Sequence, residues 1–260
     1  MTKKKRDHHK EILLKSPGDI AVMRDANRIV AEILQQVASA VAPGISTAAL
    51  DRLAEEQTKI KGARPAFKGY HGFPGTLCVS INEQVVHGIP SHDVLLADGD
   101  IVSIDFGVHY KGFYGDAAIT VPVGLVEKPR QHLIEVTREA LEKGIAQAVP
   151  GNRIVDISRA IQTHVEQHGY SVVRQFVGHG IGTSLHEGPE VPNFVRGTSA
   201  MRLLAGMVLA IEPMVNMGTY DVIICDDGWT VVTADKMPSA HFEHSVAITE
   251  NGPFILSEAS

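Results

Sequence analysis

The sequence is poor in cysteine, and its two cysteines, Cys78 and Cys225, are far apart in a chain of 260 residues. This excludes the disulfide framework that stabilises small secreted domains and favours a reducing, cytoplasmic location. No apolar run approaches the length of a membrane span, and the apolar residues 12–14 are too few for the core of a signal peptide. We therefore expect no contact with a membrane.

An excess of positive charge is also missing, because 24 Lys and Arg residues stand against 30 Asp and Glu residues, for a formal net charge of −6. Proteins that bind nucleic acid generally carry a basic surface, so we expect no DNA partner. The basic cluster at residues 3–6 lies in a predicted flexible basic N-terminal tail, residues 1–15. For this cluster, contact with ribosomal RNA is the alternative to a solvated tail.

The rest of the chain, residues 16–260, is predicted to form a single domain, because 44% apolar and 21% charged residues are ordinary globular composition. A helix is predicted to begin at Ser16-Pro17 and to end at Pro43-Gly44, and a second helix to end at Gly62. Both helices have counterparts further along the chain.

A constant offset of 107 residues relates these two parts of the sequence. The pairs that share it are Leu34 and Leu141, Pro43 and Pro150, Gly44 and Gly151, Arg52 and Arg159, Gly62 and Gly169, Leu96 and Leu203, Gly99 and Gly206, Ile104 and Ile211, and Asp105 and Glu212. Coincidence among common Gly and Pro stops is the alternative. We predict two related α+β halves, about residues 16–121 and 129–252, packed around a pseudo-twofold axis.

Acidic residues interrupt the strands that are predicted in the first half. Asp105 lies in a strand over residues 101–108, and Asp116 lies in its hairpin partner, residues 113–121. If Tyr110 and Lys111 form the turn, the two acids face each other, where like charges are destabilising unless a cation lies between them. A bulge at Gly112 would change this register.

The second half supplies two matching acids, Glu212 and Glu243, and a histidine, His179, in a glycine-flanked turn. Acids on apolar strands are costly to bury unless they are paired or bind metal. A salt bridge is the favoured alternative for one acid alone, but two related pairs favour a metal site. Four carboxylates and one imidazole suit two divalent ions, which typically lie about 3.5–4 Å apart and can lower the pKa of a bound water from 15.7 to about 7.

A series of short motifs around these residues resembles the type I methionine aminopeptidases of peptidase family M24, from about residue 16 to residue 252. The motifs are Asn82-Glu83-Gln84-Val85-Val86-His87-Gly88-Ile89-Pro90, Ser103-Ile104-Asp105, Gly115-Asp116, Gly178-His179-Gly180-Ile181-Gly182, Leu185-His186-Glu187, Ile211-Glu212-Pro213 and Phe242-Glu243-His244. The resemblance implies the pita-bread fold, a pseudo-twofold α/β fold in which helices flank a central antiparallel sheet. It also implies a hydrolase with two divalent metal ions, which are cobalt, manganese, iron or zinc.

The activity implied by this resemblance is removal of the N-terminal methionine from nascent proteins when the second residue is small, by a metal-bound hydroxide. The implied partners are nascent polypeptides with a free N-terminal methionine and, transiently, the ribosome. The enzyme would act as a monomer in the cytoplasm. Nothing in the sequence selects one metal, because all four would accept these ligands.

Carried over by motif, Asp105 would bind one ion, His179 and Glu212 the other, and Asp116 and Glu243 would bridge the two.

Catalytic roles follow from the same resemblance. His186 would hydrogen-bond the scissile carbonyl oxygen, His87 would contact the substrate beside the scissile amide, and Glu212 would also shuttle a proton to the leaving amine. Without the motifs around them, His87 and His186 would be read as core histidines.

The methionine side chain would enter a pocket of aromatic and sulfur-containing residues, where soft apolar walls suit a thioether. The matching positions hold Tyr70, Phe73, Cys78, Leu185 and Trp229. This sequence differs from some relatives at Phe67, Val86 and Leu185, which puts the shape of the pocket in question. A monovalent cation is also expected near Asn82, Gln84 and Ser239.

Two alternatives share this fold. A proline-specific aminopeptidase, such as aminopeptidase P or prolidase, would have the same metal ligands but usually carries a large extra N-terminal domain. Only about 15 residues precede the first predicted helix here. A non-catalytic binding module would typically have lost ligands, whereas all five are present.

Overall fold

Helices form two pairs in the computed structural model, which describes residues 12–197 and 201–258. The first pair is α1 (Pro17–Ala40) and α2 (Thr47–Ile60), and the second is α3 (Lys128–Ala146) and α4 (Ile154–Gln167). Helix α1 begins at Ser16 because Ser16 and Asp19 cap each other: the Asp19 N–H donates to Ser16 Oγ at 3.2 Å and the Ser16 N–H donates to Asp19 Oδ2 at 2.9 Å. None of the helices in the described part of the chain has the length and apolar character needed to cross a bilayer.

The helix pairs repeat each other at the spacing seen in the sequence. Both ends of α4 lie 107 residues after the ends of α2. The Gly44 N–H donates to the Leu96 carbonyl at 2.7 Å, and its counterpart, the Gly151 N–H, donates to the Leu203 carbonyl at 3.1 Å. Both glycines have a positive φ, 88° and 92°, which a residue with a Cβ rarely adopts. The chain therefore leaves the first helix of each pair by the same turn.

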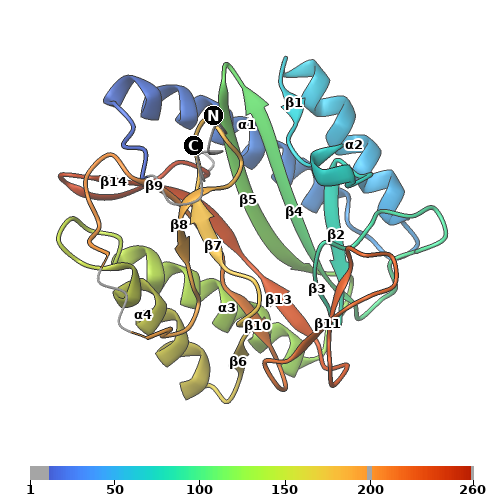
Figure 1. Cartoon of the computed structure of the whole chain (residues 1–260). Helices are drawn as coiled ribbons and strands as arrows, with labels where there is room; N and C mark the ends of the chain where they lie inside the picture. Colours follow the sequence, from blue (N-terminus) through green and yellow to red (C-terminus); the bar gives the residue numbers. More distant parts are fainter. Residues whose placement is uncertain (1–11, 198–200, 259–260) are drawn as a thin grey trace, which may run out of the picture.

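A central sheet of nine strands in the described residues lies between the helix pairs (Figure 1). All of its strand pairs are antiparallel, and its order is β1-β4-β5-β14-β9-β7-β8, with β2 beside β4 and β15 beside β14. The strands of this sheet are β1 (Arg64–Pro65), β2 (Leu77–Ile81), β4 (Ile101–Tyr110), β5 (Phe113–Pro122), β7 (Gly178–Gly180), β8 (Glu187–Val191), β9 (Val208–Ile211), β14 (Glu243–Thr249) and β15 (Gly252–Ile255). Pairing of β5 with β14 joins the two parts of the chain, so their acids meet near the middle of the sheet.

Two small three-stranded sheets lie beside the central one in the described structure. Their strands are β6 (Ser171–Val172), β10 (Met214–Asn216) and β13 (Ser239–His241) in one, and β3 (Gln84–Val86), β11 (Val222–Ile224) and β12 (Val231–Thr233) in the other. A short 3-10 turn, η2 (Tyr70–Gly72), follows β1.

The turn between β4 and β5 is not formed by Tyr110 and Lys111, the turn that would place Asp105 opposite Asp116. Asp105 lies opposite Ala118, and Asp116 lies opposite Gly107. The turn residues are Lys111 and Gly112, whose φ values are 47° and 89°; two-residue hairpin turns of type I′ require a positive φ at both positions and favour glycine. Direct facing of Asp105 and Asp116 is therefore wrong, and they are diagonal neighbours on one face of the hairpin.

The predicted N-terminal tail is described only from residue 12, so the basic cluster at residues 3–6 lies outside the described residues. Ile12 packs against the core that α3 and α4 cover, and Lys15 is buried. The packed part of the chain therefore begins before residue 16.

Leu50 offers a test of the core under α1 and α2, where its side chain is fully buried. We expect Leu50→Ala to lower the free energy of unfolding by about 2–5 kcal/mol, because the lost contacts leave a cavity. Leu125→Ala is the matched control, since Leu125 is 87% exposed, and should change stability by less than about 0.5 kcal/mol. Denaturant unfolding of metal-free protein measures both values. Equal stabilities of the two variants would contradict this assignment of the core.

Candidate metal centre and active site

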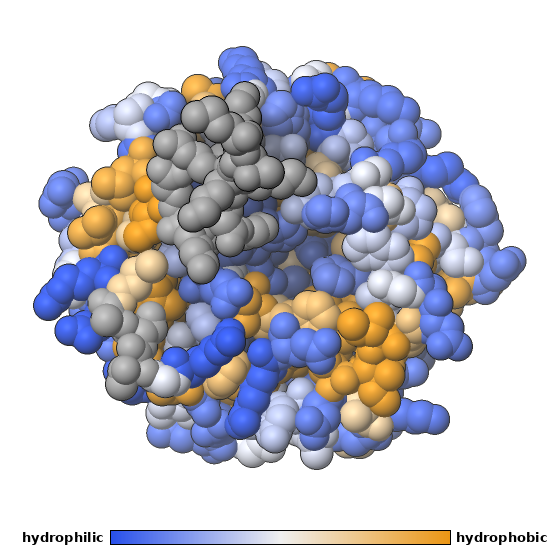
Figure 2. All heavy atoms as spheres, in the orientation of Figure 1, coloured by the Kyte–Doolittle hydropathy of each residue, from blue (hydrophilic) through white to orange (hydrophobic). Residues whose placement is uncertain are grey.

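A cavity of about 210 Å³ opens beside the strands that carry the acids. Figure 2 shows that this face of the molecule is hollowed near its centre, with hydrophilic residues in the hollow and hydrophobic residues along its lower edge. All the predicted metal ligands, both predicted catalytic histidines and all the predicted pocket residues line the cavity. These residues are Asp105, Asp116, His179, Glu212, Glu243, His87, His186, Tyr70, Phe73, Cys78, Leu185 and Trp229.

Three of the predicted ligands form a tight buried cluster. One ligand atom each from Asp116, His179 and Glu243 lies within 4.8 Å of the other two. Glu212 adjoins the cluster, because its Oε1 lies 3.4 Å from His179 Nε2. Asp105 reaches the same face from β4, diagonally across from Asp116.

Several oxygens of these acids have no hydrogen-bond donor in the described part of the chain, namely Asp105 Oδ1, Asp116 Oδ1 and Glu243 Oε1. A buried carboxylate oxygen without a partner is costly, and native proteins rarely leave one. A cation removes this cost, and carboxylates with one imidazole are donors that divalent metals accept. The residues present therefore fit a metal centre.

Burial controls the electrostatics of this cluster. It raises the pKa of Asp105 to about 7, and it raises the pKa of Asp116, Glu212 and Glu243 well above the usual range, with repulsion among these carboxylates adding to the effect. It also lowers the pKa of His179 to about 4, so this imidazole is neutral at neutral pH, as a metal ligand must be. Ionised carboxylates in this site repel one another unless positive charge lies among them.

The protonation of His179 follows from its contact with the chain. Its Nδ1 lies 3.0 Å from the Gly180 carbonyl oxygen, and because a carbonyl only accepts, Nδ1 carries the proton. The lone pair is then on Nε2, the atom that faces Glu212. The flanking glycines allow this position, since a Cβ on Gly178 would lie 2.3 Å from the Ala210 carbonyl oxygen on the neighbouring strand β9.

The two predicted catalytic histidines both line the cavity and have different neighbours. His186 Nδ1 is 2.7 Å from Tyr70 Oη, and the His186 ring centroid is 4.3 Å from that of His179. His87 lies between Phe176 and Trp229, with ring centroids 5.5 and 6.4 Å away, and burial lowers its pKa. Both rings are therefore held by aromatic neighbours beside the acid cluster.

Apolar side chains close one side of the cavity. Phe73 and Trp229 pack edge to face with ring centroids 5.2 Å apart, and Cys78 and Leu185 are buried. Burial, together with nearby carboxylates, raises the pKa of the Cys78 thiol, so Cys78 is a small apolar wall residue. The positions at which the sequence differs from some relatives, Phe67, Val86 and Leu185, all line the same cavity.

Two of the residues predicted to hold a monovalent cation are in contact. The Ser239 N–H donates to the Asn82 carbonyl oxygen at 2.8 Å. Gln84 lies in β3 and its Oε1 accepts the Ile81 N–H at 3.0 Å. The Arg130 guanidinium donates to Asn82 Oδ1, and the presence of a cation at these residues stays a prediction.

One buried histidine in the site was missed from the sequence. His241 is 1% exposed, its Nε2 lies 3.7 Å from Glu212 Oε2, and neither ring nitrogen has a hydrogen-bond partner in the described residues. Its place two residues before Glu243 was the available signal, because alternate residues of an extended strand point to the same face. Phe176, Val177 and Met214 also line the cavity and carry no such signal.

Comparisons with known proteins agree with this geometry. The sequence model of metallopeptidase family M24 matches residues 21–250 of this chain. A methionine aminopeptidase of Clostridium perfringens is 55% identical over 246 residues, which cover 95% of this chain and 98% of that protein. The chain belongs to the methionine aminopeptidases of metallopeptidase family M24. Methionine aminopeptidase 1 of Bacillus subtilis is 51% identical, over 95% of this chain and 99% of its own length.

Solved structures of this family place the methionine aminopeptidases nearer than the proline peptidases. The crystal structure of methionine aminopeptidase from Thermotoga maritima has a TM-score of 0.93 at 45% identity, and covers 95% of this chain and all of its own. Prolidase from Pyrococcus furiosus has a TM-score of 0.75 at 23% identity, with 66% of its chain covered, and shares the fold. The predicted family, the metallopeptidase class and the pita-bread fold are confirmed.

Proposed function

We propose that this family member removes N-terminal methionine from peptides whose second residue is small. The observation that carries the proposal is one cavity in which an acid cluster fit for metal lies directly beside an apolar pocket. Such a pocket can hold the methionine side chain while its amide bond lies at the cluster.

Five residues would hold two divalent ions in this cluster: Asp105 would bind one, His179 and Glu212 would bind the other, and Asp116 and Glu243 would be shared by both. When bound, such ions polarise the scissile carbonyl and lower the pKa of a water molecule. Four carboxylates balance the charge of the two ions, which supports two ions over one. Cobalt, manganese, iron(II) and zinc all accept these donors, and availability selects among them.

The side chains around the ions carry the other steps. His186 donates to the oxygen on which negative charge grows, held in place by its contact with Tyr70. Glu212, whose Oε1 lies 3.4 Å from His179 Nε2, would accept the proton of the attacking water and pass it to the leaving amine. His87 contacts the substrate beside the scissile amide.

The pocket for methionine consists of Tyr70, Phe73, Cys78, Leu185 and Trp229. The buried thiol and the edge-to-face pair of Phe73 and Trp229 offer the polarisable surface that a thioether prefers.

We also propose the domain organisation, the cellular location and the oligomeric state in which this activity occurs. Residues 16–260 form one catalytic domain of two related halves, which the repeated turns and helices support. Both cysteines are free thiols, which suits a reducing compartment such as the cytoplasm. We propose that the protein acts there as a monomer on nascent chains at the ribosome. A monovalent cation at Asn82, Gln84 and Ser239 would be structural.

A set of peptides that varies positions one and two tests the specificity. Met-Ala, Met-Gly and Met-Ser peptides should lose methionine, whereas Met-Lys and Met-Phe peptides should be largely spared. A bulky second side chain displaces the carbonyl from the cluster, and misplacement of about 1 Å can cost roughly 10²-fold in rate. Mass spectrometry of the products measures each peptide in the presence of added divalent metal.

Two further peptides separate this function from its alternatives. Acetyl-methionine peptides should stay intact, because the free amine is part of the substrate. Efficient release of the first residue from Xaa-Pro peptides, with little use of methionine, would move the protein to the proline peptidases. No hydrolysis of any peptide by metal-loaded protein would favour a binding module.

A further inference from the structure

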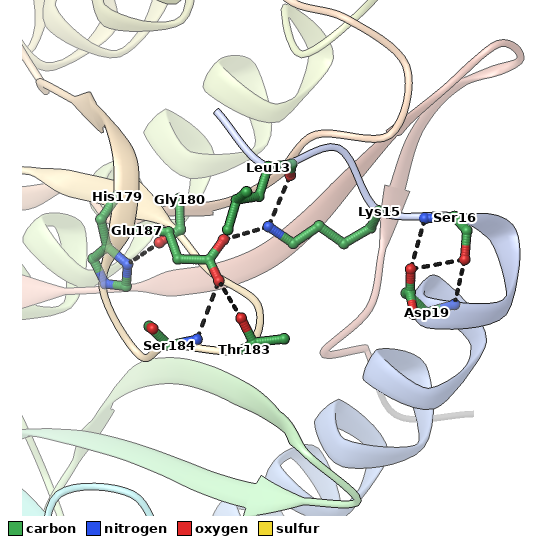
Figure 3. A network of polar contacts seen from close by, with 9 residues as sticks. All are labelled: Leu13, Lys15, Ser16, Asp19, His179, Gly180, Thr183, Ser184 and Glu187. Atoms are coloured by element: carbon green, nitrogen blue, oxygen red, sulfur yellow. Dashed lines mark hydrogen bonds and ion pairs between the residues drawn. The ribbon is translucent and has the colours of Figure 1, made fainter. Parts of the chain in front are cut away.

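The segment before α1 is tied to the loop that carries His186 by a buried ion pair. The Lys15 ammonium group contacts the Glu187 carboxylate, and the two side chains are 6% and 4% exposed (Figure 3). Glu187 is the first residue of β8 and directly follows His186 in the chain. The pair therefore joins a residue at the start of the described chain to the edge of the active site.

Both partners of this pair are fixed by further contacts. Glu187 Oε1 accepts the Ser184 N–H at 3.1 Å and the Thr183 hydroxyl at 3.3 Å. Lys15 donates from Nζ to the Leu13 carbonyl at 2.9 Å and from its backbone N–H to the Gly206 carbonyl at 2.7 Å. The Glu187 carboxylate thus binds two residues of its own loop, Thr183 and Ser184. Lys15 is held by the carbonyls of Leu13 and Gly206.

Lys15 and Glu187 pack so closely against Gly182 that no side chain would fit at this position. A Cβ on Gly182, in the loop between β7 and β8, would lie 2.3 Å from Lys15 Cε and 2.7 Å from Glu187 Oε1. The Lys15 stem therefore lies directly on the backbone of the loop. The same loop begins at β7, which carries His179, and ends at His186.

Loss of the lysine would leave the Glu187 carboxylate buried without its counter-ion, and an unpaired buried charge is strongly unfavourable. The carboxylate would turn toward water, and the backbone of residues 186 and 187 would move with it. His186 would then leave the place that its 2.7 Å contact with Tyr70 defines.

We propose that Lys15 is a positioning residue for the peptidase reaction, and that its pair with Glu187 holds the His186 ring at the cleavage site. This inference rests on the role proposed above for His186. The described residues 12–15 are then a strap across the active-site loop.

Lys15→Met tests the strap, because methionine keeps the length of the stem and removes the charge. We expect kcat on a Met-Ala-Ser peptide to fall by about 10- to 100-fold, as misplacement of about 1 Å can cost up to that factor. KM and the number of bound metal ions should change little, because the Lys15–Glu187 pair itself contains neither a proposed metal ligand nor a pocket residue. Wild-type kcat in this variant would overturn the proposal.

A double-mutant cycle with His186→Ala separates positioning from general damage. If Lys15 acts through His186, Lys15→Met should have almost no effect on kcat once His186 is alanine. If the two losses multiply, Lys15 does not act through His186 and the proposal is wrong. A His186→Ala variant as fast as wild type would instead remove the role of His186 itself.

Two further variants complete the experiment. Lys61→Met is the matched control, because Lys61 pairs with Glu32 on the surface with its side chain 34% exposed, and it should leave kcat unchanged. If Lys15→Met does not fold, Lys15→Met with Glu187→Gln takes its place in the cycle, since neutralising both partners leaves no buried charge. We expect kcat of this double variant to fall in the same direction but by less, because the ion pair is lost while no buried charge is left to turn toward water. This loss should be absent in the His186→Ala background, and wild-type kcat would overturn the proposal.

Discussion

Replacement of Asp116 by asparagine is expected to lower kcat/KM by far more than about 10²-fold, the loss that a partner outside the ligand set typically causes. Asp116 belongs to the tight cluster with His179 and Glu243, and one of its buried oxygens has no partner in the described chain. As a bridging ligand it would contact both ions, so its loss should release at least one of them. Metal analysis of the purified variant, beside its activity at saturating metal, measures both effects.

The same substitution should have the opposite effect on the metal-free protein. Burial and repulsion from Asp105 raise the pKa of Asp116, so the ionised site is destabilising without metal. Asp116→Asn removes one of these charges and should make the metal-free protein more stable than the metal-free wild type. Thermal unfolding in the presence of chelator measures the difference.

Asp93→Asn is the control for the Asp116 variant, because Asp93 is exposed and is not among the described residues that line the cavity. It should change neither metal content nor activity. Full activity of wild-type protein in a verified metal-free preparation would end the metal assignment altogether.

The repeated halves show how much of the fold a single sequence can predict. Glycine and proline stops recur at a constant offset because each half needs the same turns, and the structure places α2 and α4 at that offset. Equivalent bridges also form between Ser46 and Leu95 and between Arg153 and Arg202. These features depend on local chemistry, which the sequence carries directly.

The register of β4 against β5 was harder to predict from the sequence, because it depends on which two residues form the turn. Lys111 adopts a positive φ that lysine rarely takes, and Gly112 follows it with another. With Lys111 and Gly112 in these conformations as the two turn residues, Asp105 pairs with Ala118. Residue type alone left open whether Tyr110 and Lys111 form the turn or whether a bulge at Gly112 changes the register.

Site residues outside the motifs could not be predicted for a different reason. Lys15 is far from Glu187 in the chain, and a lysine before a helix ordinarily lies in solvent. Its burial depends on the path of residues 12–15 across the loop. The sequence of these residues has no hydrophobic periodicity that would predict this path. The acids, by contrast, stand on apolar strands, where a buried charge is costly, and His179 stands between glycines; these unusual local settings identified them.

Replacement of His186 by alanine is expected to lower kcat by about 10²–10³-fold, the usual loss when one donor to a developing oxyanion is removed. Bound metal should stay stoichiometric, because His186 lies beside His179 but outside the acid cluster, with ring centroids 4.3 Å apart. Stopped-flow or steady-state kinetics on Met-Ala-Ser, with metal analysis of the same sample, measures both quantities.

Two companion variants decide what His186 contributes. Tyr70→Phe removes the hydroxyl that lies 2.7 Å from His186 Nδ1 but keeps the ring, so its loss of kcat should be in the same direction and smaller. His92→Ala is the control, because His92 is exposed and contacts Arg52 away from the cavity. Loss of a hydrogen-bond donor whose effect appears only as charge develops should lower kcat and kcat/KM together and leave substrate binding nearly unchanged. Near-normal turnover of His186→Ala with full metal content would show that the ring fills space in the site and donates nothing to the reaction.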